Sequence, residues 1–399
     1  MSDPSRRDPT KTGPGPQDSG AGDGPDRLPS RPSGPRSTPP RAPIRDGSPG
    51  GGAGRSASAP GGGGKKKERD PSLPPRSSRR PRQTGEAGRQ PLAPNRHLNA
   101  VQTQRTPQYL VIGHICADLQ PDGSVVLGGT ALYSALTAAR LGWRVGVLTR
   151  GAFGGTFDGM VVPSLAEFAG ELSIICQDAD RPTTFVNEYM ADRRVQTVRH
   201  WAGPIDLRGL PPHWRNARVI HLGPIADEID PKTTGALTPT FLGATPQGWM
   251  REWPRETGGK VKHTHLRLPP ELLSRLDGVV VSVEEISQAR EVVERVGSRR
   301  LGVITRGEGG ARVLYGGETV DLPGFKIPTV DLTGAGDVFA AAFFCRATDR
   351  SASAVTAGRF ANAVAALSLR AIGPTGVPTL TEVEELLRWD EEGSTARRR

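Results

Sequence analysis

The segment VDLTGAGDVF, residues 330–339, decides the fold of this chain. Its two glycines, Gly334 and Gly336, flank a small residue, Ala335, so the backbone can turn sharply and its amide groups stay open to a ligand. Residues 338–345 carry no charge and include three consecutive alanines. This pattern predicts a buried, closely packed helix that begins at a tight glycine turn.

The N-terminus of such a helix predicts an anion site. Free amide groups and the helix dipole favour a phosphate, or the negative charge that develops during phosphoryl transfer. Asp337 lies at this point, where a carboxylate would repel a bound phosphate. It suits a general base that takes a proton from a hydroxyl group attacking that phosphate. The alternative is that Asp337 only caps the helix.

Residues 331–339 resemble the C-terminal signature of the PfkB, or ribokinase-like, family of carbohydrate kinases, which usually reads D-T-x-G-A-G-D-x-F. The resemblance implies a catalytic base at Asp337, an anion hole at Gly334, Ala335 and Gly336, and a monovalent-cation site, for instance for K⁺, at Asp331 and Thr333. It also implies ATP as phosphoryl donor and Mg²⁺ as its metal.

The composition divides the chain near residue 107. Residues 1–107 are rich in Pro, Gly, Ser and Arg and contain neither Phe nor Trp, so they cannot bury enough apolar surface to offset chain entropy. They hold 20 of the 52 Lys and Arg residues but only 9 of the 42 Asp and Glu residues, which leaves a nearly neutral remainder. We expect a disordered basic tail at 1–106 that could contact nucleic acid through the basic runs at 65–67 and 76–82. A solvated extension without function and a start codon assigned too far upstream are the alternatives.

Cysteine usage and hydropathy limit the setting of the protein. The three cysteines, Cys116, Cys176 and Cys345, are widely separated, so neither a disulfide framework nor a zinc site is indicated. No apolar run approaches the length of a membrane span. We therefore expect a cytoplasmic protein without a membrane partner.

The first part of the folded region predicts an acceptor site. An apolar run at 109–113 predicts a buried strand, and Asp118 follows it where ligands gather in open α/β sheets. Gly128 and Gly129 precede a helix predicted at 131–141. They resemble the family's G-G-x-x-x-N-x-A motif, which implies that these glycines line the sugar site. Asp118 as a plain turn residue stays open.

Two further segments of the sequence predict substrate contacts. Residues 183–189 and 194–201 alternate in polarity around a short turn, which predicts a hairpin, and this hairpin resembles the family's β-sheet lid. The face of its first strand that carries Asn187 could meet the substrate. Gln247 and Arg251 lie in an unusual polar and aromatic loop, where a guanidinium group suits an anionic acceptor. The alternatives are an ordinary edge hairpin and a solvated arginine.

The donor site is implied by two segments and one helix. A strand and a glycine-rich turn at 301–311 resemble the family's T-x-G-x-x-G segment, which lines the nucleotide site through Thr305, Gly307 and Gly310. Asn362, in a helix predicted at 352–369, matches an Asn that the family places beside the adenine.

A strand that leads into a helix at 279–285 resembles the family's N-x-x-E motif, although Ser282 stands in place of the Asn. Glu285 keeps the acid, which implies a magnesium contact through water. The alternative is a glutamate that only opens the helix.

Together these patterns predict an α/β protein with a three-layer α/β/α ribokinase-like sandwich, a mostly parallel central sheet and a small β-sheet lid at about 182–203. We expect the kinase domain to span 107–390 and a disordered tail to occupy 391–399. The predicted reaction moves the γ-phosphoryl group of ATP to a hydroxyl of a sugar or polyol. An inositol or nucleoside kinase of this fold, or a ligand-binding relative without catalysis, are the alternatives, because Cys116, Ser134 and Ser282 depart from the family pattern. For assembly, a homodimer through the lid is one option.

Overall fold

The computed structural model describes residues 95–98, 103–190, 193–349 and 351–396. The predicted tail at 1–106 lies almost entirely outside the described residues, and so do its basic runs at 65–67 and 76–82. Within the described part of the chain, no helix is both long and apolar enough to cross a membrane.

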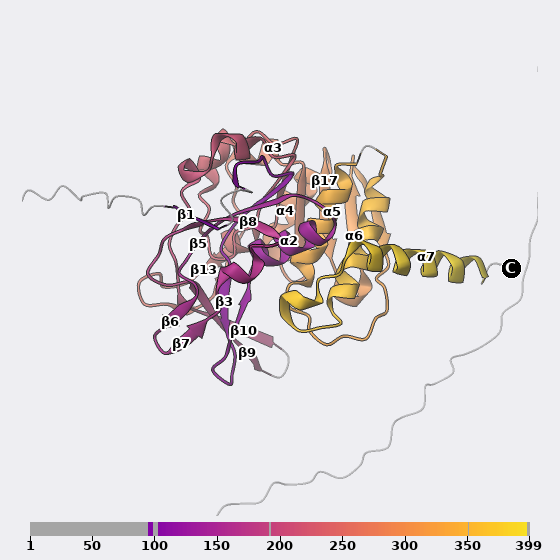
Figure 1. Cartoon of the computed structure of the whole chain (residues 1–399). Helices are drawn as coiled ribbons and strands as arrows, with labels where there is room; N and C mark the ends of the chain where they lie inside the picture. Colours follow the sequence, from indigo (N-terminus) through magenta and orange to yellow (C-terminus); the bar gives the residue numbers. More distant parts are fainter. Residues whose placement is uncertain (1–94, 99–102, 191–192, 350, 397–399) are drawn as a thin grey trace, which may run out of the picture. The chain divides into compact units, whose positions relative to one another are not determined.

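A central sheet of ten strands forms the middle layer (Figure 1). Its strands, in spatial order, are β1 (Asn95–Leu98), β8 (Leu172–Gln177), β5 (Val145–Arg150), β2 (Tyr109–Ile112), β11 (Val219–Leu222), β12 (Phe241–Ala244), β16 (Gly278–Ser282), β17 (Leu301–Thr305), β18 (Ala311–Tyr315) and β19 (Glu318–Leu322). Pairing is parallel from β8 to β17 and antiparallel at both edges. The predicted mostly parallel sheet is confirmed.

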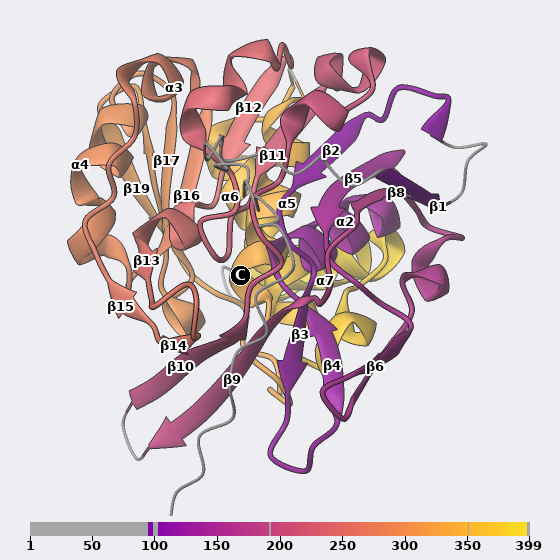
Figure 2. The same cartoon turned by 90° about the vertical axis from the view of Figure 1, so that its left-hand side faces the viewer.

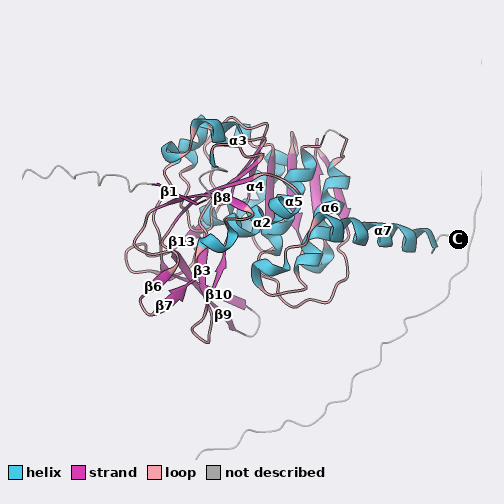
Figure 3. Ribbon diagram, viewed as in Figure 1, coloured by secondary structure: helices cyan, strands magenta, loops and turns pink. Residues whose placement is uncertain are grey.

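Helices cover both faces of the sheet because its inner strands are apolar on both sides. Along β2, Tyr109 and Val111 belong to one hydrophobic core, while Leu110 and Ile112 belong to a second. The first core also contains residues of α2 (Thr130–Arg140), α5 (Ala335–Ala347), α6 (Ala354–Ser368) and α7 (Leu380–Ala396), and the second contains residues of α3 (Pro270–Arg275) and α4 (Ile286–Gly297). This is the predicted three-layer sandwich (Figure 3).

A second sheet of five strands forms the lid beside the sandwich (Figure 2). The predicted hairpin is present as β9 (Thr183–Met190) and β10 (Arg193–His200), which pair in antiparallel register. The sequence analysis did not predict the other three strands, which are β3 (Cys116–Leu119), β4 (Val125–Gly128) and β14 (Gly259–Lys260). Two small pairs complete the strands, β6 (Gly155–Phe157) with β7 (Met160–Val162) and β13 (Arg251–Glu252) with β15 (Lys262–His263).

The limits of the folded region differ from those predicted at 107 and 390. Strand β1 lies before residue 107 and pairs with β8 at the edge of the central sheet. This pairing uses backbone groups, so the composition of the segment does not reveal it. Helix α7 continues to Ala396, so the tail expected at 391–399 is largely helical. Arg359 of α6 forms ion pairs with both Asp390 and Glu391, which link this segment of α7 to α6.

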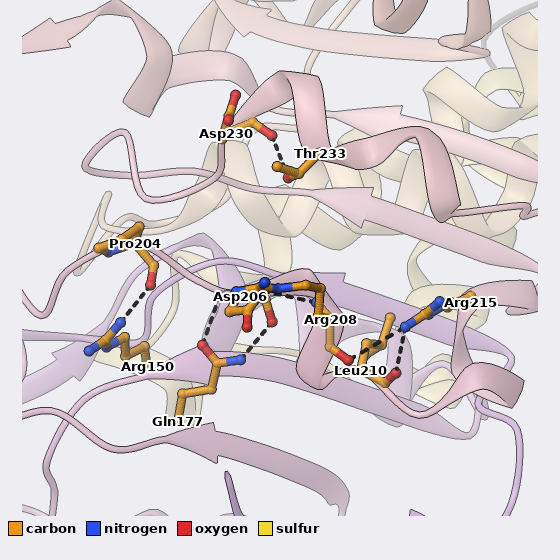
Figure 4. Close-up of polar contacts among 9 residues, drawn as sticks. All are labelled: Arg150, Gln177, Pro204, Asp206, Arg208, Leu210, Arg215, Asp230 and Thr233. Atoms are coloured by element: carbon orange, nitrogen blue, oxygen red, sulfur yellow. Dashed lines mark hydrogen bonds and ion pairs between the residues drawn. The ribbon is translucent and has the colours of Figure 1, made fainter. Parts of the chain in front are cut away.

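The chain that leaves the lid is fastened to the ends of two sheet strands (Figure 4). Arg150, at the end of β5, donates from Nη1 to the carbonyl of Pro204 at 2.8 Å. Gln177, at the end of β8, makes two hydrogen bonds with the backbone of Asp206, at 2.7 and 2.9 Å. These bonds fix the lid's exit to the sandwich.

A buried histidine in the central sheet gives a test of this packing. His221 of β11 is fully buried; the Tyr109 hydroxyl lies 2.8 Å from Nδ1 and Thr245 Oγ1 lies 2.9 Å from Nε2. Burial lowers the pKa of His221 from 6.5 to about 3. The folded protein therefore keeps this ring neutral at pH values where the unfolded chain binds a proton.

Stability should accordingly fall as the pH drops below the unfolded pKa of His221. Between pH 7 and pH 5 we expect the free energy of unfolding of the wild type to fall by about 2 kcal/mol more than that of His221→Gln, which cannot take up this proton. Urea denaturation at both pH values measures the difference. Equal losses in the two proteins would contradict the buried, neutral state of His221.

Candidate active site

The predicted glycine turn opens helix α5. Gly334 is the N-cap residue, with φ of 79° in the left-handed region, and the helix begins at Ala335. A Cβ atom at Gly334 would lie 2.5 Å from the ring of Tyr133, so both conformation and space require glycine here. A Cβ at Gly336 would meet nothing within 4 Å. The mouth of the helix is therefore approachable, and Asp337 lies in its first turn.

Helix α2 holds Asp337 from the side. Thr130 Oγ1 donates to Asp337 Oδ1 at 2.7 Å, and Ser134 Oγ donates to the backbone carbonyl of Asp337 at 3.2 Å. Both hydroxyl residues are fully buried, whereas Asp337 is half-buried. The sequence analysis missed Thr130, although its place directly after Gly128 and Gly129 at a helix start was a usable signal.

Asp118 lies against the glycine pair, as predicted. Strands β3 and β4 place Cys116 opposite Gly128, and a Cβ on Gly128 would lie 2.5 Å from Asp118 Oδ2. Cys116 Sγ donates to Asp118 Oδ1 at 3.7 Å. Only glycine at position 128 leaves room for this carboxylate.

Asp118 and Asp337 belong to one neighbourhood. Burial, and then the carboxylates of Asp331, Asp118 and Asp337, raise the pKa of Tyr133. Burial and the same two carboxylates, Asp118 before Asp337, raise the pKa of the Cys116 thiol, which Arg251 opposes. Tyr133 and Cys116 are therefore neutral groups between two aspartates and an arginine.

Gln247 and Arg251 reach this neighbourhood from the loop after β12. Gln247 Nε2 donates to Thr130 Oγ1 at 3.0 Å, and Arg251 Nη2 donates to Gln247 Oε1 at 2.6 Å. Arg251 Nη1 donates to the carbonyl of Ile225 at 2.8 Å, and its guanidinium carbon lies 5.7 Å from the ring centroid of Phe185 on β9. The structure thus brings both predicted residues to Asp337 through Thr130.

The loop that receives Arg251 is shaped by a buried carboxylate, Glu228, which the sequence analysis also missed. Its oxygens accept from the backbone amides of His114 at 2.8 Å, Ile225 at 3.0 Å and Ala226 at 2.7 Å. Glu228 is fully buried. These bonds supply acceptors for loop amides that would otherwise be unsatisfied, and they fix the carbonyl of Ile225.

Asn187 is placed within the lid. It lies opposite Gln196 in the β9–β10 hairpin, and Gln196 Nε2 donates to Asn187 Oδ1 at 3.1 Å. This cross-strand pair supports the hairpin. The substrate contact of Asn187 stays a prediction.

Two of the predicted donor residues, Gly310 and Asn362, lie against residues 322–324. Thr305 ends β17, and Gly307 and Gly310 in the following turn have φ of 54° and 79°. A Cβ on Gly310 would lie 2.2 Å from the carbonyl oxygen of Leu322. Asn362, on buried α6, donates from Nδ2 to the carbonyl of Pro323 at 3.0 Å. The side chain of Asn362 therefore organises this loop.

Two of the three predicted metal residues, Glu285 and Asp331, accept hydrogen bonds from backbone amides. Glu285 Oε2 accepts from the amide of Ser282 at 2.9 Å, and Ser282 pairs with Thr305 at the ends of β16 and β17. The Asp331 carboxylate accepts from the amides of Thr333 and Gly373, at 2.9 Å each. No group of three or more His, Cys, Asp or Glu side chains in the described residues could hold a metal ion. A single carboxylate fits Mg²⁺ held through water and donor phosphates.

Comparisons with known proteins agree with this geometry. The profile of the pfkB family carbohydrate kinases matches residues 271–380, which include α5 and its glycine turn. Over this part of its length the chain is similar to the pfkB family carbohydrate kinases. Among curated relatives, the chain is 46% identical over 85 residues to a ribokinase of Bacillus subtilis, which covers 21% of the chain and 29% of that protein.

A longer match links the chain to a nucleoside kinase of Methanothermobacter thermautotrophicus, at 28% identity over 282 residues, or 64% of this chain and 82% of that protein. The matching part of the chain covers only 28% to 40% of the length of the first three curated relatives. Among solved structures, a pyrophosphate-dependent kinase in the ribokinase family, complexed with a pyrophosphate analog and myo-inositol, superposes with a TM-score of 0.56 at 22% identity. The match covers 69% of this chain and 99% of that one, and it shows the ribokinase-like fold.

The close approach of Gly334 to Tyr133 yields a prediction for stability. Gly334→Ala should lower the free energy of unfolding by about 2 to 4 kcal/mol, because steric overlap adds to the strain of a positive φ. Gly142→Ala is the matched control, because Gly142 has φ of 88° but no atom within 4 Å of an added Cβ. It should cost only about 1 kcal/mol. Equal losses in chemical denaturation would show that Tyr133 does not restrict the turn.

Proposed function

We propose that the chain transfers the γ-phosphoryl group of ATP to a hydroxyl group of a sugar or sugar-like small molecule. The observation that carries this proposal is the setting of Asp337. Its carboxylate lies in the first turn of α5, where Gly336 leaves open space, and Thr130 holds one of its oxygens. A fixed carboxylate at an open helix N-terminus suits a base acting beside a transferring phosphate.

In the proposed reaction, Asp337 removes the proton from the acceptor hydroxyl as its oxygen bonds to the γ-phosphorus. The bond between that phosphorus and the bridging oxygen breaks, and ADP leaves. The backbone amides of Gly334, Ala335 and Gly336 stabilise the charge on the migrating group. Asp118, beside Gly128 and Gly129, accepts hydrogen bonds from other acceptor hydroxyls.

On the donor side, we assign the nucleotide to the turn after β17 and to the loop held by Asn362. Thr305, Gly307 and Gly310 line that site. Glu285 would hold Mg²⁺ through water, and Asp331 and Thr333 would hold a monovalent cation such as K⁺. Bound Mg²⁺ would supply charge neutralisation at the donor phosphates.

The lid gives the site a means of excluding water. Phe185 of β9 contacts the guanidinium of Arg251, so lid and acceptor wall are continuous, and closure would protect the phosphoryl group from hydrolysis. Asn187 would then meet the acceptor. We place the enzyme in the cytoplasm, with a homodimer through the lid as one option for its assembly. The wide separation of Cys116, Cys176 and Cys345 in the sequence favours a reducing compartment.

The acceptor and the donor can be identified with one panel. Ribose, a nucleoside and myo-inositol are each tested with ATP and with pyrophosphate as donor. The nucleoside is included because one relative is a nucleoside kinase, and myo-inositol and pyrophosphate because the structural neighbour is a pyrophosphate-dependent kinase complexed with myo-inositol. We expect ³¹P NMR to show ADP and one phosphate ester in equal amounts, with ATP preferred. Absence of any ester, with ligands still bound, would favour a relative without catalysis.

Substitution of the base is the sharpest test. Asp337→Asn should lower kcat by about 10²- to 10⁴-fold, because a general base acts only in the transition state. The dissociation constant for ATP should stay nearly unchanged. Asp349→Asn, just beyond the other end of α5 where Asp349 binds Arg346, is the matched control and should keep full activity. An active Asp337→Asn enzyme would refute the assignment of the base.

A further inference from the structure

Four side chains from three separate parts of the fold form one continuous chain of hydrogen bonds. Arg251 donates to Gln247 at 2.6 Å, Gln247 donates to Thr130 at 3.0 Å, and Thr130 donates to Asp337 at 2.7 Å. Arg251 and Gln247 come from the loop after β12, Thr130 from α2 and Asp337 from α5. We call this chain the relay.

The direction of the relay is fixed by chemistry. A guanidinium group only donates, so the Gln247 atom that faces Arg251 must be the amide oxygen. The amide nitrogen then faces Thr130, whose hydroxyl oxygen accepts from it. The single proton of that hydroxyl remains for Asp337. Reversing the Gln247 amide would set its donors against those of Arg251, so one arrangement alone satisfies all four groups.

We propose that Thr130 and Gln247 are positioning residues that carry the polarity of Arg251 to Asp337, fix its Oδ1 atom and favour its charged form. This inference deepens the proposed function and rests on it only for naming Asp337 as the base. Gln247, expected from sequence to select the substrate, acts on the base instead.

Burial at the centre of the relay strengthens its last hydrogen bond, the one that Thr130 donates to Asp337. Thr130 is fully buried, and hydrogen bonds to a charged group in a region of low dielectric constant are stronger than those in water. At its other end, Arg251 lies over Phe185 of lid strand β9 and binds the carbonyl of Ile225. The relay therefore connects the lid to the base.

Other groups also act on Asp337, and the test must separate their influence. The titratable and charged groups around it, from β2, β3, α2, the loop before α5 and the Arg251 loop, are Tyr109, Cys116, Asp118, Tyr133, Asp331 and Arg251. Burial raises the pKa values of Tyr109, Cys116 and Tyr133, so these three stay neutral at working pH. Asp118, Asp331 and Arg251 are the remaining ionisable groups of this set.

The experiment measures the Asp337 pKa in the full chain by ¹³C NMR of labelled aspartate carboxyl groups, with the Asp337→Asn spectrum assigning the signal. Thr130→Val should raise this pKa by about one unit or more, because it removes a hydrogen bond to the charged form. Gln247→Leu should raise it by less. In the double variant, Gln247→Leu should add nothing, because the relay acts through Thr130.

Two controls separate the relay from a general packing defect. Thr130→Ser should restore the wild-type pKa, because it keeps the hydroxyl. Thr137→Val removes another fully buried hydroxyl from the same helix, one that donates to the carbonyl of Tyr133, and should leave the Asp337 pKa unchanged. An unchanged pKa in Thr130→Val would overturn the relay, and so would an equal effect of Gln247→Leu in both backgrounds.

The outcome also separates the relay from the proposed function. The NMR titration needs neither donor nor acceptor, so a shifted pKa together with an inactive wild type would reject the kinase assignment and keep the relay. An active wild type with an unshifted pKa would do the reverse. With the acceptor from the panel, the acidic limb of the kcat/KM profile should move upward by the same amount in Thr130→Val.

Discussion

The contact between helices α2 and α5 is the constraint on which the site depends. Gly334 lets the start of α5 approach the ring of Tyr133 more closely than any side chain would allow. This approach brings Thr130 within 2.7 Å of Asp337 and Ser134 within 3.2 Å of its carbonyl. The three alanines of α5, Ala340, Ala341 and Ala342, are fully buried and keep the helix close to the sheet. A wider spacing would leave Asp337 as an ordinary residue of a helix start.

Local pattern was enough to predict the layers and several parts of the site. The apolar run of β2 and the uncharged face of α5 follow directly from the requirement that inner strands and a central helix be buried. Gly334 and Gly128 were recognisable from the glycine motifs around them, and the structure adds that a Cβ atom at either position would meet a ring or a carboxylate.

Contacts between distant segments could not be predicted in this way. Thr130 and Asp337 are 207 positions apart, and Gln247 reaches Thr130 from 117 positions away. The hydrogen bonds of Gln247 to Thr130 and Arg251 were therefore not predicted. Glu228 was missed for the same reason, since its role is set by the amides of His114, Ile225 and Ala226. Strand β1 depended on an edge of the sheet that composition does not show.

The site separates neutral from charged groups, and this separation explains how one aspartate can act as a base beside another. Burial keeps Cys116 and Tyr133 protonated, so they add no negative charge between Asp118 and Asp337. Arg251 is the nearby cation, and its hydrogen bond to Gln247 directs its influence toward Asp337. Asp118 keeps the thiol of Cys116 as its neutral donor. Two carboxylates of the same kind thus receive different partners, one suited to hold hydroxyl groups and the other to remove a proton.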